Sequence, residues 1–270
     1  MNRKYIHKDL IDSTSSEIGR LALDGAPEGT IVIANKQTAG KGRRGRSWEA
    51  EAGTSLLFSL LLRPKIAPDA APQITLLMAM AVTRVIREWT GLEAKIKWPN
   101  DVVVNAKKVC GILTEMQLKN GDIDYVVVGT GVNVKQTSIP TELENSATSI
   151  LLEKEKQLEL AKTVSGTCDE VSGAGMEFDC DELLKRILDV FEEYYELFLQ
   201  KQNLSDFMKE YNEWLVSLDK EVKVLDPKGE FTGISQGINE KGELLVALSS
   251  GEVIAIYAGE VSVRGLYGYV

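Results

Sequence analysis

The chain has 270 residues, of which 44% are hydrophobic and 26% are charged, values typical of a globular protein with a substantial core. Its 31 lysines and arginines are outnumbered by 40 aspartates and glutamates, and this balance argues against broad nucleic-acid affinity, which depends on basic side chains that contact phosphates. The N-terminus has no apolar run typical of a secretory signal, and no stretch approaches the ~18 apolar residues of a membrane span.

Cysteine and histidine usage argues against several kinds of site. Cys110, Cys168 and Cys180 form neither a CxxC pair nor an even disulfide framework, so we expect reduced thiols and a cytoplasmic location. His7 is the single histidine and lies in a polar N-terminal segment. A Ser-His-Asp or Cys-His site, or a zinc site of mixed ligands, would depend on that one residue. We therefore expect His7 to be a surface or packing residue.

The first predicted elements are a helix and a strand. A short helix is predicted over residues 13–24, because Thr14 and Glu17 have the spacing of a capping box and Gly25 stands where a C-cap belongs. The apolar run at 30–35 predicts a strand.

The next elements predict a sheet that is covered by helices. Residues 54–64 are apolar on both alternating faces, which is typical of a strand buried on both sides. Apolar residues at helical spacing predict a helix over 72–89. Tight polar turns then separate strands that we expect to form an antiparallel meander, at 95–98, 101–104, 109–117 and 123–134.

The C-terminal half changes character twice. Residues 153–180 are charged and then rich in Gly and Ser, so we predict a mobile insertion there. A helix is predicted over 181–200, and Ser205 is predicted to cap another helix that runs to about Leu215. Beyond Glu221, four or five short strands predict a small barrel-like domain, with strand sequences at 221–226, 231–238, 244–249 and 253–265. The sequence thus divides into a domain of residues 1–217 and a domain of residues 218–270.

A basic loop contains the motif with the most chemical content. Residues 35–48 hold five basic residues and three glycines. The run from Gly40 to Gly45 matches GxGxxG, but it leads toward a strand, whereas a dinucleotide fold needs a helix there. A kinase glycine-rich loop would require HRD and DFG motifs, which are absent. The remaining interpretations are a loop that binds a phosphate or carboxylate, and a basic surface loop that binds nucleic acid.

Two further stretches favour an anion-binding pocket. KWPND (97–101) ends a strand and presents an amide and a carboxylate, and GTGVNV (129–134) places Asn133 among valines, where an amide needs partners. Lys107 and Lys108 lie between these stretches in a tight turn. Basic, amide and glycine positions therefore recur at several strand ends, as they would around one pocket.

With these motifs the sequence resembles the biotin protein ligase family. The resemblance rests on DSTSSE (12–17), QTAGKGRRGRSW (37–48), KWPNDVVVNAKKVCGIL (97–113) and GTGVNV (129–134), which occur in the expected order. It implies an α+β fold: a mixed β-sheet flanked by helices, like class II synthetase cores, followed by a small C-terminal β-barrel of the Src-homology type. It also implies a short form without the N-terminal DNA-binding domain of repressor-type members, because the first motif begins at Asp12.

The resemblance implies a two-step ligase reaction. Biotin and ATP with Mg²⁺ give biotinyl-AMP and pyrophosphate, and a lysine of a biotin carrier domain, such as that of acetyl-CoA carboxylase, then takes the biotinyl group. The implied partner is therefore a biotin carboxyl carrier protein or domain, without DNA or membrane, and a homodimer is compatible with it. A lipoate ligase or related acyl transferase on the same fold is the first alternative, and a nucleic-acid-binding module that uses the basic loop is the second.

Site residues follow from the resemblance position by position. The implied biotin-binding residues are Ser13, Thr14, Ser15, Gln37, Gly40, Lys41, Gly42, Arg43, Lys108 and Gly111. The implied ATP and adenylate residues are Arg43, Arg44, Trp48, Asn100 and Asn133, with Asn100 also helping to place the metal. The implied catalytic residues are Lys108, Arg43 and Asp101, where Lys108 stabilises developing charge and Asp101 orients or deprotonates the incoming lysine. Ser15 and Lys41 depart from the family, which usually has Asn and Arg at these positions.

Overall fold

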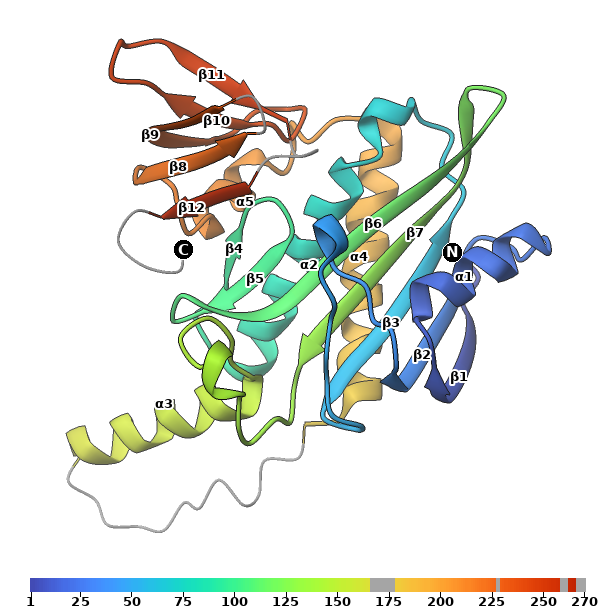
Figure 1. The fold of residues 1–270 in the computed structure, drawn as a ribbon, viewed down its shortest axis with the longest axis horizontal. Coiled ribbons are helices and arrows are strands. Elements are labelled where there is room, and N and C mark those ends of the chain that lie inside the picture. The colour runs from blue at the N-terminus through green and yellow to red at the C-terminus, as the bar shows by residue number, and fades with distance from the viewer. Residues whose placement is uncertain (166–177, 227–228, 258–261, 266–270) are drawn as a thin grey trace.

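Two β-sheets organise the chain (Figure 1). The computed structural model describes residues 1–165, 178–226, 229–257 and 262–265. Within them, the first sheet has seven strands in the order β1-β2-β3-β7-β6-β5-β4. These strands are β1 (Lys4–Ile11), β2 (Thr30–Gln37), β3 (Ser55–Leu62), β4 (Lys95–Lys97), β5 (Asp101–Val104), β6 (Lys107–Lys119) and β7 (Asp122–Asn133).

The main sheet is mixed, as predicted. β1 and β2 are parallel and are joined through a helix, whereas every other neighbouring pair is antiparallel. The predicted meander from residue 95 to residue 134 is confirmed. β1 was not predicted, because polar residues interrupt its apolar ones and most of its positions are exposed; it contains His7 and forms an edge of the sheet.

Helices cover both faces of the main sheet. The helices of the described residues are α1 (Thr14–Leu23), α2 (Gln73–Thr90), α3 (Ile150–Ser165), α4 (Cys180–Lys201) and α5 (Met208–Trp214), of which α1, α2 and α4 form this cover. Figure 1 shows α2 and α4 on one face and α1 on the other. β3 lies between these layers and is buried at all eight positions, which confirms the prediction of a strand covered on both sides.

Two predicted caps differ from the structure. Ser13, not Thr14, is the N-cap of α1, since its side chain accepts from the Ser16 N–H while Thr14 is already helical. Gly25 has a φ of 83° just after the helix end, in agreement with the predicted C-terminus. Ser205 does not cap a helix, because α5 begins only at Met208, after Phe207.

Helix α3 forms part of the segment that was predicted as a mobile insertion. Residues 153–165 are helical and Cys180 begins α4, whereas residues 166–177, including Cys168, lie outside the described residues, and the mobility of the segment stays a prediction. The sequence here is rich in Leu, Glu, Lys and Gln, which favour helix. The Ser149 hydroxyl accepts from the Leu152 N–H at 3.1 Å and so starts the helix.

The C-terminal strands form a separate antiparallel sheet. Its order is β11-β10-β9-β8-β12, from β8 (Glu221–Asp226), β9 (Gly229–Ile238), β10 (Leu244–Ala247), β11 (Val253–Ile256) and β12 (Ser262–Gly265). The Trp98 indole N–H donates to the Gly242 carbonyl at 3.0 Å and so ties this sheet to the end of β4. Apolar side chains of the second sheet, such as Val224 and Leu244, join the main core. The small C-terminal β-domain is therefore confirmed, while its boundary at residues 217/218 stays a prediction.

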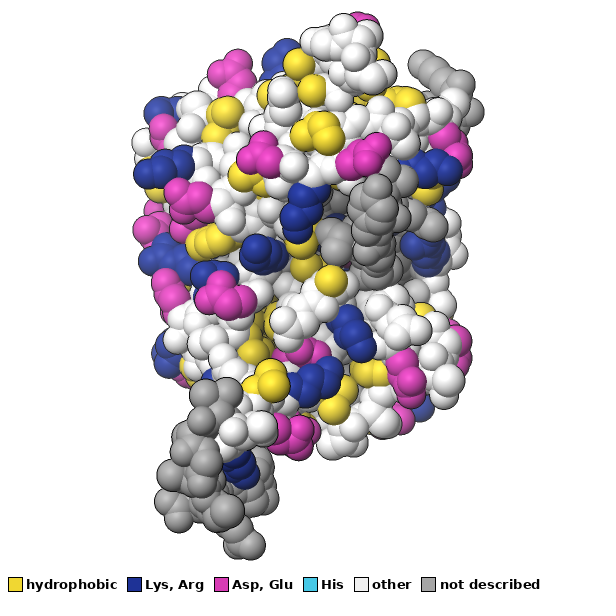
Figure 2. Space-filling view, turned by 90° about the vertical axis from the view of Figure 1, so that its left-hand side faces the viewer, with side chains coloured by type: hydrophobic (Ala, Val, Ile, Leu, Met, Phe, Trp, Pro, Cys, Tyr) yellow, Lys and Arg dark blue, Asp and Glu magenta, His cyan; other side chains and the backbone are white. Residues whose placement is uncertain are grey.

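Surface charge is mixed on the face shown in Figure 2. Lysine and arginine side chains alternate there with aspartate and glutamate, and the coloured residues form no extended patch of one sign. None of the helices in the described ranges is long and apolar enough to cross a membrane.

Candidate active site

A cavity lies where the N-terminus of α1 and the basic loop meet the middle of the main sheet. The predicted site residues that line it are Ser13, Thr14, Ser15, Gln37, Lys41, Gly42, Arg43, Trp48, Asn100, Lys108 and Gly111. It is also lined by residues that were not predicted as site residues: Leu57, Ile112, Leu113, Gly129, Thr130 and Gly131. The glycines at 129 and 131 carried a usable signal, since alternate glycines inside an apolar strand indicate close approach of another group.

Four predicted residues lie outside this lining. Gly40 is buried within the basic loop, where its carbonyl accepts from the Trp48 N–H at 2.9 Å. Arg44 is exposed. Asp101 faces Lys108 at 2.6 Å. The side-chain N–H of Asn133 donates to a backbone carbonyl at 3.0 Å. Of the four, Asp101 contacts Lys108, which lines the cavity, and Asn133 contacts the Thr148 carbonyl. Gly40 holds the loop closed through its bond to Trp48.

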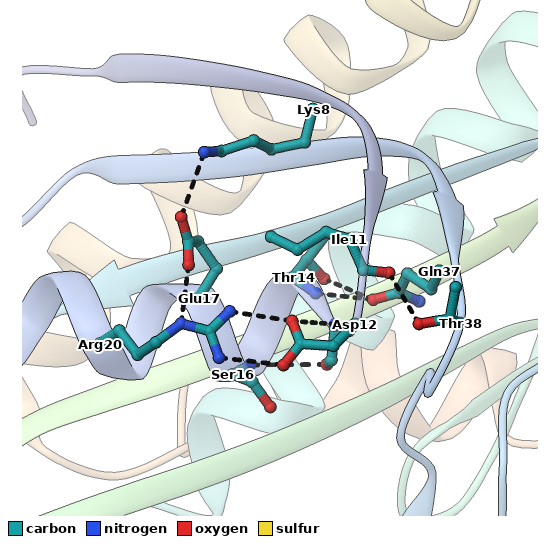
Figure 3. Close-up of polar contacts among 10 residues, drawn as sticks. Lys8, Ile11, Asp12, Thr14, Ser16, Glu17, Arg20, Gln37 and Thr38 are labelled. Atoms are coloured by element: carbon teal, nitrogen blue, oxygen red, sulfur yellow. Dashed lines mark hydrogen bonds and ion pairs between the residues drawn. The ribbon is translucent and has the colours of Figure 1, made fainter.

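Hydroxyl groups at the start of α1 form a polar wall with Gln37 (Figure 3). The Gln37 side-chain oxygen accepts from the Thr14 N–H at 2.7 Å and from the Thr14 hydroxyl at 3.1 Å. Ser59, on β3, donates to the Thr14 hydroxyl at 2.8 Å and lies 3.0 Å from the Ser15 hydroxyl. Because the oxygen of Gln37 is occupied, its amide nitrogen is the group left to meet a ligand. Sequence reasoning missed Ser59, a serine within an apolar strand.

Charged side chains hold this wall in place (Figure 3). Arg20 donates to both carboxylate oxygens of Asp12 at 2.9 Å and to Glu17 at 2.8 Å, and Lys8 pairs with Glu17 at 3.3 Å. The hydrogen bonds from Arg20 and from the Ser13 N–H lower the pKa of Asp12 to about 2. Asp12 is therefore ionised at neutral pH, and a negative charge at this end stabilises the helix.

The floor of the cavity is a pair of glycines. Gly111 on β6 and Gly131 on β7 are direct register partners. A Cβ atom at Gly131 would lie 2.6 Å from the Trp48 ring, and one at Gly111 would lie 2.7 Å from it. The indole of Trp48 therefore rests on bare backbone. Its buried N–H has no hydrogen-bond partner among the described residues, and the Lys108 ammonium lies 5.3 Å from the ring centroid.

Three basic side chains surround the floor. The basic loop turns back on itself, since the Gly42 N–H donates to the Arg46 carbonyl at 2.7 Å, and this turn directs Arg43 inward. Arg43 donates to the Asn100 side-chain oxygen at 3.0 Å, and burial lowers the pKa of its guanidinium, which nevertheless stays charged. Lys41 pairs with Glu115 at 3.6 Å, and Lys108 is the third cation.

The arrangement combines two kinds of recognition. A polar wall with fixed hydroxyls and an amide suits a neutral polar group, and the cations suit a carboxylate or phosphate. Both lie in one cavity over a flat floor. The site can therefore bind a molecule that has a neutral polar end and an anionic end.

Gly131→Ala should displace the indole of Trp48, because the new methyl group would overlap the ring. We expect more acrylamide quenching of Trp48 fluorescence in the variant. Since the chain has four tryptophans, the Trp48 signal is obtained by difference from matching Trp48→Phe proteins. Gly19→Ala is the control, because its Cβ would approach no atom closer than 3.9 Å. Equal quenching in Gly131→Ala and the parent would show that the indole does not rest on this floor.

Comparison with known proteins agrees with this site. Residues 9–133 match the profile of the biotin/lipoate A/B protein ligase family, and residues 217–264 match that of the biotin protein ligase C-terminal domain. The chain is 34% identical to the bifunctional ligase/repressor BirA of Bacillus subtilis, over 97% of this chain and 74% of that protein. It is 30% identical to the biotin–[acetyl-CoA-carboxylase] ligase of Paracoccus denitrificans, over 94% of this chain and 98% of that one.

A solved structure extends the match to the whole fold. The biotin protein ligase of Aquifex aeolicus, in complex with biotin and ATP, superposes with a TM-score of 0.78 at 31% identity. The superposition covers 98% of this chain and 100% of that one, so it includes both sheets. This chain belongs to the biotin protein ligase family.

Proposed function

We propose that the protein attaches biotin to a lysine of a carboxylase carrier domain, using ATP and a biotinyl-AMP intermediate. The observation that carries this proposal is the convergence of the family motifs on one cavity with a neutral polar wall and a cationic side. The Aquifex aeolicus relative is described as a complex with biotin and ATP, and the Paracoccus denitrificans relative as a biotin–[acetyl-CoA-carboxylase] ligase, which supports the same substrates.

In the proposed first step, biotin lies with its ring system against the polar wall and its carboxylate toward Lys108 and Arg43. A carboxylate oxygen attacks the α-phosphorus of ATP, the bond to pyrophosphate breaks, and biotinyl-AMP forms. Lys108 and Arg43 stabilise the negative charge that builds on the phosphate oxygens, and both are held in place before the reaction. Preorganised cations lower the barrier because they need no rearrangement as charge develops.

In the proposed second step, the ε-amine of the carrier lysine attacks the biotinyl carbonyl carbon, and AMP leaves. The attacking amine must lose a proton, and the carboxylate of Asp101 is our candidate to accept or orient it. Asp101 lies 2.6 Å from Lys108, so it also holds that cation in the absence of substrate. The two roles are compatible, because phosphate oxygens replace Asp101 as partners of Lys108 once ATP binds.

The ATP side of the proposed site is formed by the loop and the strand ends. Asn100 donates to the Ile112 carbonyl and accepts from Arg43, so it places ATP through that guanidinium. The Trp48 indole offers an aromatic face to adenine. Exposed Arg44 is free to approach a phosphate, and Asn133 is held at the end of β7 by its bond to the Thr148 carbonyl.

Mg²⁺ enters this proposal as part of the nucleotide substrate. No group of three His, Cys, Asp or Glu side chains in the described part of the chain could hold a metal by itself. That fits an ion that keeps most of its water and is bound chiefly by phosphate oxygens. Asp101 and Asn100 are our candidates for protein oxygens that support it.

The partner and the cellular location are part of the same proposal. The partner is a biotin carrier domain, and an ATP-dependent reaction with free thiols at Cys110 and Cys180 fits the cytoplasm. A homodimer and the absence of DNA binding stay predictions. Mixed charge on the face in Figure 2 offers no broad surface for nucleic acid there.

Pyrophosphate exchange into ATP tests the proposed function. Exchange should require biotin and should not occur with lipoate in its place. Exchange that depends on lipoate alone would instead favour the lipoate ligase, whose family shares the N-terminal profile.

Lys108→Ala should lower the rate of biotinyl-AMP formation by ~10²-fold, the usual effect of removing one preorganised donor at a site of developing charge. Single-turnover adenylation measures this rate directly. Lys107→Ala is the matched control, since Lys107 bonds to the Glu144 carbonyl at 2.6 Å on the surface and does not line the cavity. Normal single-turnover adenylation by Lys108→Ala would remove Lys108 from the chemistry.

Asp101→Asn should slow transfer to the carrier lysine by ~10²-fold, as expected for loss of a general base, and should slow adenylation less. Transfer is measured from preformed biotinyl-AMP. As a control, a small amine that is neutral at the assay pH needs no deprotonation before attack, so its biotinylation should change little. If adenylation and transfer fell equally, Asp101 would serve only to hold Lys108 and ATP.

Binding of biotin and ATP together should protect the basic loop from trypsin. Arg44 and Arg46 are exposed, whereas Arg43 is half-buried, so cleavage of the free protein is expected after Arg44 and Arg46. Like charges and three glycines favour mobility until an anion binds, and closure then excludes water from the adenylate. Lys119, at the exposed end of β6, is an internal control whose cleavage should not change. Equal cleavage of the loop with and without both ligands would mean that it does not close.

A further inference from the structure

A buried carboxylate lies behind the site. Glu153, in the first turn of α3, is only 1% exposed. Its oxygens accept from Asn105 at 2.6 Å, from the Thr148 hydroxyl at 2.7 Å and from Lys156 at 2.7 Å. Desolvation alone would raise the pKa of Glu153, but the hydrogen bonds from Lys156, Thr148 and Asn105 lower it overall. The carboxylate is therefore ionised and paired, which is rare for a buried glutamate.

The first partner belongs to the turn that carries Lys108. Asn105 and Ala106 connect β5 to β6, with φ values of 49° and 61°. Two successive positive φ angles define a tight hairpin turn that non-glycine residues adopt reluctantly. The bond from Asn105 to Glu153 ties this turn to α3.

The second partner connects Glu153 to two proposed site residues. The Thr148 N–H donates to the Lys108 carbonyl at 2.9 Å, and the Lys108 N–H donates to the Ser146 carbonyl at 2.9 Å. The Thr148 carbonyl accepts from the Asn133 side chain at 3.0 Å. Residues 146–148 thus lie as a short strand along Lys108, and Thr148 reaches Asn133, Lys108 and Glu153 with its three polar groups.

We propose that Glu153 is a positioning residue of the ligase, which locks residues 146–148 and the β5–β6 turn together and so fixes Lys108 and Asn133 for ATP. This inference rests on the proposed function. Glu153 acts through backbone, because it touches neither the cavity nor Lys108 directly. The wall proposed to hold the biotin ring system belongs to α1, β2 and β3, so Glu153 should affect the rate of adenylation more than the binding of biotin.

Thr148→Val tests the proposal, since it keeps the side-chain shape and removes the hydroxyl that reaches Glu153. In biotin-dependent pyrophosphate exchange we expect kcat to fall ~10-fold, the scale of one lost hydrogen bond to a charged acceptor, with a smaller change in KM for biotin. Thr148→Ser should restore kcat. Asn105→Gly removes the other contact and suits the positive φ of an exposed turn, so it should fold normally and also lower kcat.

Lys156→Ala is the matched control. It removes the third partner of Glu153, on a half-exposed side chain, without touching the turn or residues 146–148. We expect kcat to stay at the parent value. A loss of kcat in Lys156→Ala as large as in Thr148→Val, or a parent-like kcat in both Thr148→Val and Asn105→Gly, would overturn the positioning role.

Amide hydrogen exchange gives a readout that does not need activity. Thr148→Val should speed exchange of the Lys108 amide, while amides of β3 such as Phe58 should keep their protection. Unchanged protection of Lys108 would overturn the inference on its own. A parent protein without biotin-dependent pyrophosphate exchange would contradict the proposed function instead, so the two failures are distinguishable.

Discussion

The cavity depends on the glycines that are paired across β6 and β7. Any side chain at Gly111 or Gly131 would enter the volume that the Trp48 ring fills. Glycines weaken a strand, since they contribute no packing and lose much conformational freedom on folding. The neighbouring strand offsets this weakness, because β3 is buried along its whole length between two layers of helices. A flat, rigid patch of backbone is thus maintained in the middle of the sheet.

The cations around this patch have close partners. Lys108 faces Asp101, Arg43 is bonded to Asn100, and Lys41 faces Glu115. These partners limit the repulsion between three positive charges and also set their directions. The chain as a whole is acidic, with 40 Asp and Glu against 31 Lys and Arg. Positive charge is therefore concentrated at the site, which attracts an anionic substrate more strongly than the rest of the surface does.

Sequence analysis predicted the elements and residues whose signals are local. Helix α2 and the meander follow from periodicity and turn residues, and most of the cavity lining follows from the basic loop and the family motifs. Edge strand β1 was missed because half-exposed strands lack a continuous apolar pattern. Ser59 and Glu153 were missed for a different reason. Each acts through partners distant in the chain or on another element, and nothing in the neighbouring sequence distinguishes it from an ordinary serine or glutamate.

The position of Trp48 has a consequence for affinity. A ligand that is to use the same two glycines must take the place of the indole, so binding is a substitution and not the filling of an empty space. The apparent affinity is then the intrinsic affinity multiplied by the fraction of molecules in which the indole has already moved away. A first ligand that holds the indole elsewhere raises that fraction for the second. Two substrates can thereby favour each other's binding through a single side chain, in addition to any contact that they make with each other.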